Sequence, residues 1–516
     1  MGIDEMIEEL AQRRAAAREM GGKEKIARQH EQGKLTARER IDLLFDGGTF
    51  QEYGLLATHQ SERPEMHDRV TPADGVITGF GEIEGRHAGV VAEDFTVLGG
   101  SLGMTGFLKK VRMVEIATQE RVPLVWMLDG AGARAEEFIA EGLPAVFHHL
   151  KIAKMSGISP QVGIVMGPSA GDSSLVGSLL EFIIMVEGHG MMAAGGPPVV
   201  LRATHEDVTK DELGGVSVHC HVSGVADNPV KSDEDAIETA KRYLSYLPSS
   251  AWQYPPHVQS SDDPWREDES LLSVIPENPR RPYDMKRIIE SVVDKGSFFE
   301  IKPHYAPMMI TGFARMDGDS VGIVANQPSV FAGAITAKAA RKERRFIDLC
   351  TAYHLPLIFF VDVPGVMTGP QSEREGALRD GLAVAYALAW SDVPKMTLVI
   401  RKAFGFGGSA MCGYGAGQTL TLAWPTVEFG SIPTDSGVLA AYKQEIASAE
   451  DPEKLIRDLE ERYRSYSGPY PAAGHFNVDD VIDPRETRPR LIRALKLALN
   501  RRSAPPSPVM RHGVMP

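Results

Sequence analysis

The chain has 516 residues, of which 43% are hydrophobic and 24% are charged, and its formal net charge is −14. This composition is typical of a soluble globular protein, and the length predicts two or more domains rather than one core. An acidic chain without a basic block excludes a nucleic-acid backbone as its main partner.

The cysteines and apolar segments indicate the compartment in which the protein is expected to function. Cys220, Cys350 and Cys412 are its only cysteines and none forms a CxxC pair, so we expect neither a disulfide framework nor a thiolate zinc site. The first residues lack the apolar core of a signal peptide. Charged residues and glycines interrupt the longest apolar region, residues 175–201, which predicts buried core rather than a membrane span. A cytoplasmic location fits best.

In chain order, a charged helical arm is expected up to residue 40, followed by strands and helices that alternate. The expected strands are residues 89–92, 124–128 and 163–166, and the expected helices are residues 108–120 and 145–155. This alternation predicts an α/β architecture around a largely buried sheet.

The second half of the chain repeats the first. GFGEIEG at residues 79–85 precedes Gly89, and GFARMDG at residues 312–318 precedes Gly322 (322 − 89 = 233). The same spacing relates Asp129, after an apolar run, to Asp362. Upstream, Glu52 is echoed by Glu300. A period this long indicates a duplicated domain and not a solenoid.

The repeat and a change of composition set the expected boundaries. Residues 250–281 are rich in Pro, Ser and Asp and are interpreted as a linker. We therefore expect an arm over residues 1–40, a first domain over 41–249, a second domain over 282–502 and an extended tail over 503–516.

Familiar side-chain catalysts are missing from the sequence. It contains no GxSxG elbow, HExxH helix or GxxxxGK[ST] loop. His205, His219 and His221 lie near acidic residues, but their spacing fits no standard site, so we expect no metal. For Asp129 and Asp362, a structural role in the turn is favoured over proton transfer.

Glycine-rich turns are the alternative source of chemistry. They fall where strands are expected to end and helices to begin, where main-chain N–H groups are left free and the helix dipole favours negative charge. Such donors can form an oxyanion hole for an enolate, and two duplicated domains would supply two holes. Taken singly, each turn is better explained as a tight connection, but several turns at matched places in the two halves favour the hole. The turns lie at residues 99–101, 130–132, 167–171, 365 and 405–408.

From about residue 34 to residue 501, the sequence resembles the carboxyltransferase (beta) subunits of propionyl-CoA, acetyl-CoA and methylcrotonyl-CoA carboxylases. The stretches that carry this resemblance are DFTVLGGS at 94–101, EDVT at 206–209 with ELGG at 212–215, VGIVANQP at 321–328, FVDVPG at 360–365, RKA at 401–403 and AWPT at 423–426.

The resemblance implies two crotonase-like domains of ββα units in a homo-oligomer, usually a hexamer built as a trimer of dimers. Each active site would lie between the first domain of one subunit and the second domain of another. Acyl-CoA would lie against the first domain and carboxybiotin against the second. Carboxybiotin would release CO₂, and the resulting biotin enolate would take the α-proton of the acyl thioester, whose enolate then attacks CO₂.

The family motifs also imply the residues that do this. The thioester hole matches Ala131 and Gly132, and the biotin hole matches Phe406 and Gly407. Further residues are expected to contact the two substrates. For acyl-CoA they are Gly99, Gly100, Lys109, Arg112, Gly167 and Gly171, and for biotin they are Gly365, Gly405 and Ser409.

This chain departs from the family near both holes. Ala131 replaces the first glycine of the usual pair, which requires a negative φ there. The usual Gly-Gly-Ala-Tyr is replaced at residues 405–408, and Ser409 stands where propionyl-preferring members carry an Asp that helps to set acyl size. These changes affect the choice of acyl group most.

Biotin itself is expected to arrive on another chain. The family's carrier domain presents a Met-Lys pair on an exposed hairpin, whereas Met285-Lys286 follows Asp284 in a segment that predicts an ordinary helix start. The implied partner is a biotin carboxylase or biotin carboxyl carrier subunit.

Two other functions remain open. The same site run in reverse would serve a biotin-dependent decarboxylase or transcarboxylase. The changes near Phe406 and Ser409 also allow a scaffold that binds acyl-CoA without turnover. A crotonase-type hydrolase is weaker because the sequence offers no Ser-His-Asp arrangement.

Overall fold

A computed structural model describes residues 2–139, 146–278, 281–510 and 512–516. The chain divides into two compact units, one formed by Met1–Gln253 with Ser507–Pro516 and the other by Tyr254–Pro506. Most of the segment expected as a linker thus belongs to the second unit. The end of the tail packs on the first unit, where the Val514 N–H donates to Ser156 Oγ at 3.0 Å.

The first unit is built on a seven-stranded mixed sheet with the order β1-β2-β3-β4-β5-β7-β9. Its first three strands are antiparallel and the others are parallel. The strands are β1 (Gln51–Tyr53), β2 (Val76–Ile83), β3 (Arg86–Glu93), β4 (Leu124–Leu128), β5 (Gln161–Val165), β7 (Phe182–Val186) and β9 (Asn228–Val230), and a separate pair is β6 (Pro168–Ala170) with β8 (Met191–Ala193).

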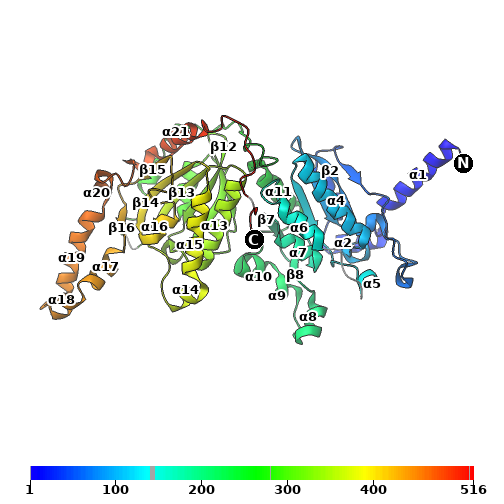
Figure 1. The fold of residues 1–516 in the computed structure, drawn as a ribbon, viewed down its shortest axis with the longest axis horizontal. Coiled ribbons are helices and arrows are strands. Elements are labelled where there is room, and N and C mark those ends of the chain that lie inside the picture. The colour runs from blue at the N-terminus through cyan, green and yellow to red at the C-terminus, as the bar shows by residue number, and fades with distance from the viewer. Residues whose placement is uncertain (1, 140–145, 279–280, 511) are drawn as a thin grey trace. The chain divides into compact units, whose positions relative to one another are not determined.

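Helices connect the parallel strands of this unit and flank its sheet (Figure 1). The main ones are α4 (Met104–Glu120), α6 (Val146–Met155), α7 (Asp172–Ser178) and α11 (Asp233–Tyr246). The expected helices over 108–120 and 145–155 correspond to α4 and α6, and residue 145 lies outside the described residues. The charged arm holds α1 (Ile3–Arg18), α2 (Lys23–Glu31) and α3 (Ala37–Leu44).

The second unit repeats this plan with an eight-stranded sheet in the order β10-β11-β12-β13-β14-β15-β17, and β16 pairs with β14. The strands are β10 (Phe299–Ile301), β11 (Met309–Met316), β12 (Asp319–Asn326), β13 (Leu357–Val363), β14 (Lys395–Phe404), β15 (Leu420–Ala423), β16 (Glu428–Gly430) and β17 (Asp480–Val481), and the main helices are α12 (Met285–Val292), α13 (Ala337–Ala352), α15 (Ala377–Trp390), α16 (Gly405–Ala410) and α21 (Thr487–Leu499).

The structure confirms the duplication. Glu52 lies opposite Gly79, and Glu300 lies opposite Gly312, so both edge strands have the same register. A short parallel bridge joins Leu102 to Ala133 in the first unit, and its counterpart joins Ile335 to Val366 in the second (335 − 102 = 233). The predicted α/β architecture is therefore confirmed in both halves.

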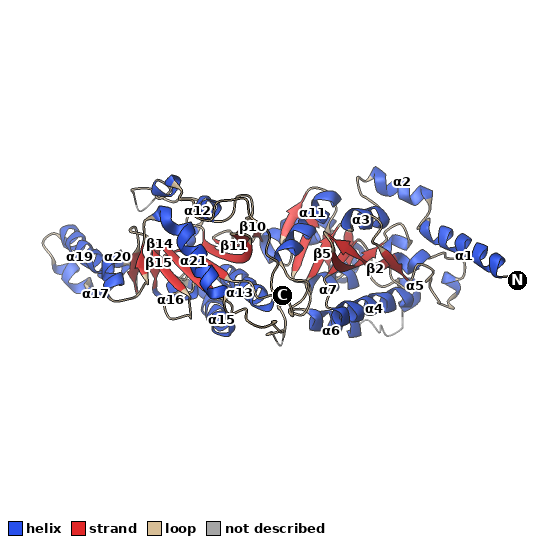
Figure 2. Ribbon diagram, turned by 90° about the horizontal axis from the view of Figure 1, so that it is seen from above, coloured by secondary structure: helices blue, strands red, loops and turns tan. Residues whose placement is uncertain are grey.

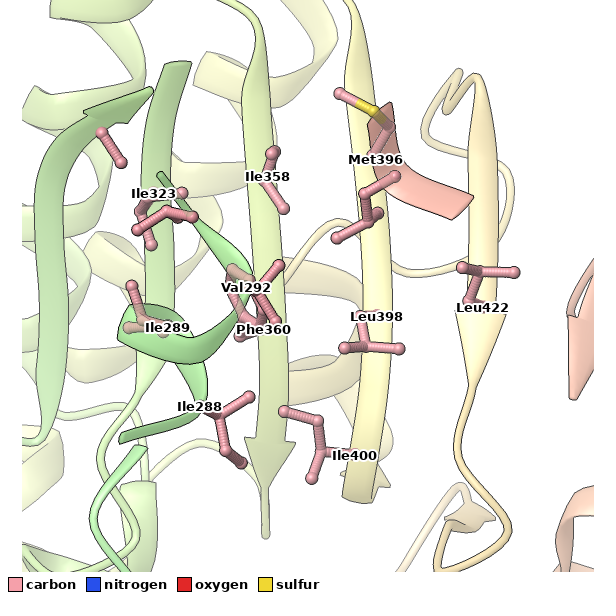
Figure 3. Packing of buried hydrophobic residues seen from close by; sticks show 14 of the residues in the cluster. Ile288, Ile289, Val292, Ile323, Ile358, Phe360, Met396, Leu398, Ile400 and Leu422 are labelled. Carbon is pink, nitrogen blue, oxygen red and sulfur yellow. The ribbon is translucent and has the colours of Figure 1, made fainter. Parts of the chain in front are cut away.

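The core of the second unit shows why its strands read as continuous apolar runs. All seven residues of β13 are buried because helices cover both faces of the sheet (Figure 2). Ile288, Ile289 and Val292 of α12 pack on one face against strand residues that include Ile323 and Phe360 (Figure 3). Burying each such side chain contributes roughly 1.5–3 kcal/mol.

The same helix accounts for the Met-Lys pair. Asp284 caps α12 by accepting the Lys286 N–H at 3.0 Å, and Met285 is fully buried. Lys286 forms an ion pair with Glu300 at 2.6 Å. The prediction of an ordinary helix start is confirmed. Among the described residues, no helix is long and apolar enough to cross a membrane.

Candidate functional site

In the first unit, the residues predicted to form the thioester hole lie in the turn after β4. Two main-chain hydrogen bonds of 2.8 Å fix the path of this turn, which is called the thioester turn below. The Leu102 N–H donates to the Gly132 carbonyl, and the Arg134 N–H donates to the Leu102 carbonyl. The Ala131 N–H donates to the Gly99 carbonyl at 3.1 Å. In the described part of the chain, the N–H groups of Gly132 and Ala133 have no hydrogen-bond partner.

The two residues of the expected donor pair, Ala131 and Gly132, differ in their surroundings. Ala131 lacks a positive φ, as its Cβ requires, but its N–H already holds the turn together. Gly132 has φ +80°, and a Cβ there would lie 2.6 Å from the Ala170 carbonyl oxygen. Only glycine therefore fits this position without moving the neighbouring strand.

The other glycines predicted in this unit gather around the same turn. A Cβ on Gly100 would lie 2.4 Å from the Asp129 carbonyl oxygen, and one on Gly167 would overlap the Asp129 carboxylate. Gly171, with φ +57°, leads into α7. The fold thus brings Gly99, Gly100, Gly132, Gly167 and Gly171 to the ends of adjacent strands, where main chains approach closely.

Asp129 has a structural role in this frame. Its buried carboxylate accepts from Lys34 Nζ at 2.8 Å and from Arg40 Nη1 at 2.9 Å. Burial lowers the pKa of Lys34, against the opposing effect of Asp129. These two contacts indicate that the carboxylate anchors α3 and the residues before it to the end of β4.

Lys109, which is expected to contact a CoA phosphate, and its neighbour Lys110 are both held by groups of the first unit. Lys109 Nζ donates to the carbonyl oxygens of Ala73 and Val76, and burial lowers the pKa of Lys109 to about 8. Lys110 is fully buried between Glu93 Oε1, at 2.8 Å, and Asp172 Oδ2, at 3.0 Å. Of the two predicted basic contacts, only Arg112 is exposed.

In the second unit, the predicted biotin hole lies where β14 ends and α16 begins. Gly405 has φ +55° and opens the helix. The N–H groups of Phe406 and Gly407 are in the first turn, where a helix offers them no acceptor. No acceptor from another element is found for them among the described residues. A Cβ on Gly407 would lie 2.7 Å from Gly365 Cα, so these two glycines allow the main chains to touch.

A cavity of about 390 Å³ adjoins this turn and is lined by Gly405, Gly408, Ser409, Tyr466 and His475 among others. A second cavity of about 570 Å³ is lined by Phe406, Ser409 and Lys395. Ser409 thus borders both. Gly365 lies against Gly407 and not in either lining.

Asp362 is the counterpart of Asp129 and is also buried. It accepts from Arg401 Nε at 3.0 Å, Tyr283 Oη at 2.9 Å and the Lys402 N–H at 3.2 Å. Burial raises the pKa of Asp362, and the neighbouring Arg401 opposes this shift. The contacts indicate that it anchors the start of the RKA motif.

Three polar residues escaped the sequence analysis. His148, His149 and Asp172 converge in the first unit beside the thioester turn, with Asp172 Oδ1 2.8 Å from His148 Nε2 and 3.1 Å from His149 Nε2. The only signal in the sequence is the paired histidines, because the carboxylate follows more than twenty residues later and fits no metal motif.

Residues 28–514 match the carboxyl transferase domain family. The chain is 39% identical over 519 residues to the propionyl-CoA carboxylase, carboxyltransferase subunit, of Haloferax mediterranei, covering 100% of both chains. It is also 39% identical to the methylmalonyl-CoA decarboxylase subunit alpha of Veillonella parvula, covering 100% of this chain and 99% of the other.

Among solved structures, transcarboxylase 12S, described as a hexamer with methylmalonyl-coenzyme A and methylmalonic acid bound, superposes with a TM-score of 0.92 at 37% identity. That alignment covers 100% of this chain and 99% of the other. The predicted crotonase-like fold is therefore confirmed.

Proposed function

Because the chain belongs to the carboxyl transferase domain family, we propose that it is the carboxyltransferase subunit of a biotin-dependent acyl-CoA carboxylase. The observation that carries the proposal is similarity along the full length of a propionyl-CoA carboxylase subunit. The plan that the two units share, each with free N–H groups at a strand end among the described residues, agrees with chemistry that proceeds through enolates.

In the first unit, the thioester oxygen is held by the N–H groups of Gly132 and Ala133. Both lack a partner in the described residues, whereas the Ala131 N–H fixes the turn through Gly99. Donors that are already oriented stabilise the charge that develops on the oxygen without reorganisation, and each commonly contributes about 2.7–4 kcal/mol. Arg112 supplies the exposed charge available to a CoA phosphate.

In the second unit, the carrier-bound biotin lies against Gly405 and Ser409, with Gly365 supporting Gly407 from behind. The fit rests on the free N–H groups of Phe406 and Gly407 and on a cavity of about 390 Å³ beside them, a size usual for small-molecule sites. Carboxybiotin, when bound, supplies the carboxyl group. The chain's own part is to orient the ureido oxygen with two N–H donors.

The biotin is carried by a biotin carboxyl carrier or biotin carboxylase subunit in the cytoplasm. Met285 is buried and Lys286 is paired with Glu300, which leaves no exposed Met-Lys hairpin at this position. The biotinylated lysine is therefore supplied by a partner chain.

A homo-oligomer, a hexamer as described for transcarboxylase 12S, is supported by an apolar stripe on α15. Leu378, Leu382, Tyr386 and Trp390 are spaced four residues apart on one face of this helix, with exposures of 68%, 47%, 72% and 78%. Large exposed apolar surfaces of this kind mark interfaces. A second copy of the chain is the proposed occupant, so that the first unit of one copy meets the second unit of another.

A biotin-dependent decarboxylase or transcarboxylase is the second candidate. The chain is as similar to the methylmalonyl-CoA decarboxylase subunit as to the propionyl-CoA carboxylase subunit, 39% in each case. The two activities use the same site in opposite directions.

The deciding experiment supplies the purified chain with a biotin carboxylase and carrier, ATP and labelled bicarbonate, and offers acetyl-, propionyl- and longer acyl-CoAs. Incorporation of label into at least one of them is expected. Malonyl- and methylmalonyl-CoA are offered in parallel to biotinylated carrier without ATP, where carrier carboxylation alone would favour the decarboxylase. Failure in both directions would favour a scaffold without turnover.

A further inference from the structure

A buried cluster of three side chains in the first unit has the composition of a metal site. His148 and His149 are adjacent on α6, and Asp172 is the first residue of α7. His148 is 1% exposed and Asp172 is 6% exposed, while the side chain of His149 is 21% exposed. One ligand atom from each lies within 4.8 Å of the other two.

The contacts inside the cluster have the distances of ion pairs, but their angles are not those of hydrogen bonds. Asp172 Oδ1 is 2.8 Å from His148 Nε2 and 3.1 Å from His149 Nε2, yet neither pair has hydrogen-bond geometry. All three atoms are buried, and none has a hydrogen-bond partner among the described residues. A buried polar group left in this condition costs about 1–3 kcal/mol, so three such atoms within 4.8 Å of one another favour the binding of a ligand between them.

The spacing suits a first-row transition ion. Such ions bind imidazole nitrogen and carboxylate oxygen at about 2.0–2.1 Å, so ligands at 90–109° to one another sit roughly 2.9–3.4 Å apart. The two distances to Asp172 Oδ1 fall close to that range. Two imidazoles with one carboxylate form a donor set that Zn²⁺, Co²⁺ and Ni²⁺ accept.

The surroundings orient the carboxylate and supply the counter-charge. Asp172 Oδ2 accepts from Lys110 Nζ at 3.0 Å, which leaves Oδ1 directed at the imidazoles. Lys110 is also paired with Glu93 Oε1 at 2.8 Å, so the cluster retains one excess negative charge. Outer contacts of this kind fix a ligating carboxylate.

We propose that His148 Nε2, His149 Nε2 and Asp172 Oδ1 bind a divalent transition-metal ion. Three protein ligands leave at least one position for water or an anionic oxygen, which is the pattern of sites that bind exchangeable ligands. A Cβ on Gly132 would lie 3.1 Å from the Asp172 N, so the residue that supplies the carboxylate adjoins the turn that contains Gly132. The paired histidines are not part of any standard metal motif in the sequence, and for this reason the sequence predicted no metal.

Cobalt titration of the untagged, full-length chain tests the site without any assay of turnover. Apo-protein prepared with a chelator is titrated with Co²⁺ at pH 7.5, and the visible d–d absorption and bound metal are measured. Binding of about one ion per chain with a spectrum for nitrogen and oxygen ligands is expected.

The matched variants are His149→Gln, which changes a partly exposed ligand, and His87→Gln, whose side chain is 74% exposed on β3. His149→Gln should lower the Co²⁺ affinity at least about tenfold and alter the spectrum, and His87→Gln should change neither. Circular dichroism checks that both are folded. The proposal is overturned if the wild-type chain takes up no stoichiometric Co²⁺, or if the two variants bind it equally well.

Discussion

Equivalent positions in the two units keep the same backbone frame but carry different charges. In the first unit, Glu93 accepts the Asp129 N–H at 3.0 Å, and in the second unit Asn326 accepts the Asp362 N–H at 3.1 Å. On the helix that follows this strand in each unit, Lys110 of the first unit is replaced by Glu343 of the second (343 − 110 = 233). The duplicated contact to the main chain is retained, whereas the ionic network is not.

The consequence of this replacement is a change in how each unit buries a polar group. Lys110 is satisfied by Glu93 and Asp172. Glu343 is fully buried, and neither of its carboxyl oxygens has a hydrogen-bond partner among the described residues. Burial raises the pKa of Glu343 well above its usual range, and the second unit thus holds a buried acid where the first holds a paired cation. The backbone that forms the turns tolerates both.

Substituting both positions by methionine gives the largest expected difference. Lys110→Met leaves two buried carboxylates without their cation and should lower the free energy of unfolding by about 3–5 kcal/mol. Glu343→Met removes a group that has no partner and should be neutral or stabilising. Urea unfolding of both variants measures this contrast. Equal destabilisation would show that the charge network contributes nothing beyond packing.

Substitution of the two turn glycines compares the units by activity. Gly132→Val and Gly407→Val should each reduce carboxylation by about 10²–10³-fold, because each new side chain displaces the N–H donors of its hole. Gly85→Val is the control for Gly132, since Gly85 has φ +73° and open space around its Cβ position. The oligomer should remain assembled by size-exclusion chromatography. Near-normal turnover in both variants would remove the assignment of the holes.

The sequence revealed the features that depend on main-chain geometry. The 233-residue repeat identified the duplication, and glycines at strand ends identified the turns, because close main-chain approach leaves no room for a Cβ. It did not reveal hydrogen bonding within the turn, where the Ala131 N–H is taken by Gly99. Nor did it reveal the direction of Lys109, which depends on carbonyls more than thirty residues away. The cluster of His148, His149 and Asp172 forms only when two helices meet, so no local pattern encodes it.

The pH dependence of stability probes the buried Glu343 of the second unit. In the folded chain the pKa of Glu343 is raised, whereas in the unfolded chain it is near 4.5. The folded state therefore binds more protons above that pH, and stability should fall as the pH rises towards the folded pKa, by at most about 1.4 kcal/mol per pH unit. Glu343→Gln has no such proton, so the difference in unfolding free energy between variant and wild type should grow in the variant's favour from pH 5 to pH 8. A constant difference would mean that Glu343 is ionised in both the folded and the unfolded state over this pH range.

The smallest expected effect is at a third duplicated position, where it distinguishes a residue that contacts the substrate from one that only supports the fold. Arg112 of α4 is exposed, and its counterpart Arg345 of α13 is only partly exposed (345 − 112 = 233). If Arg112 meets a CoA phosphate, Arg112→Ala should raise the KM for acyl-CoA severalfold, as expected for a solvent-screened charge pair of about 0.2–1 kcal/mol, and leave kcat unchanged. The effect should weaken at high salt because exposed charges are screened. Arg345→Ala, made in the unit assigned to biotin, should leave the KM for acyl-CoA unchanged. An equal rise in both variants would mean that the basic residues of these helices act through the fold, and the contact to CoA would then have to be sought on the main chain of the glycine turns.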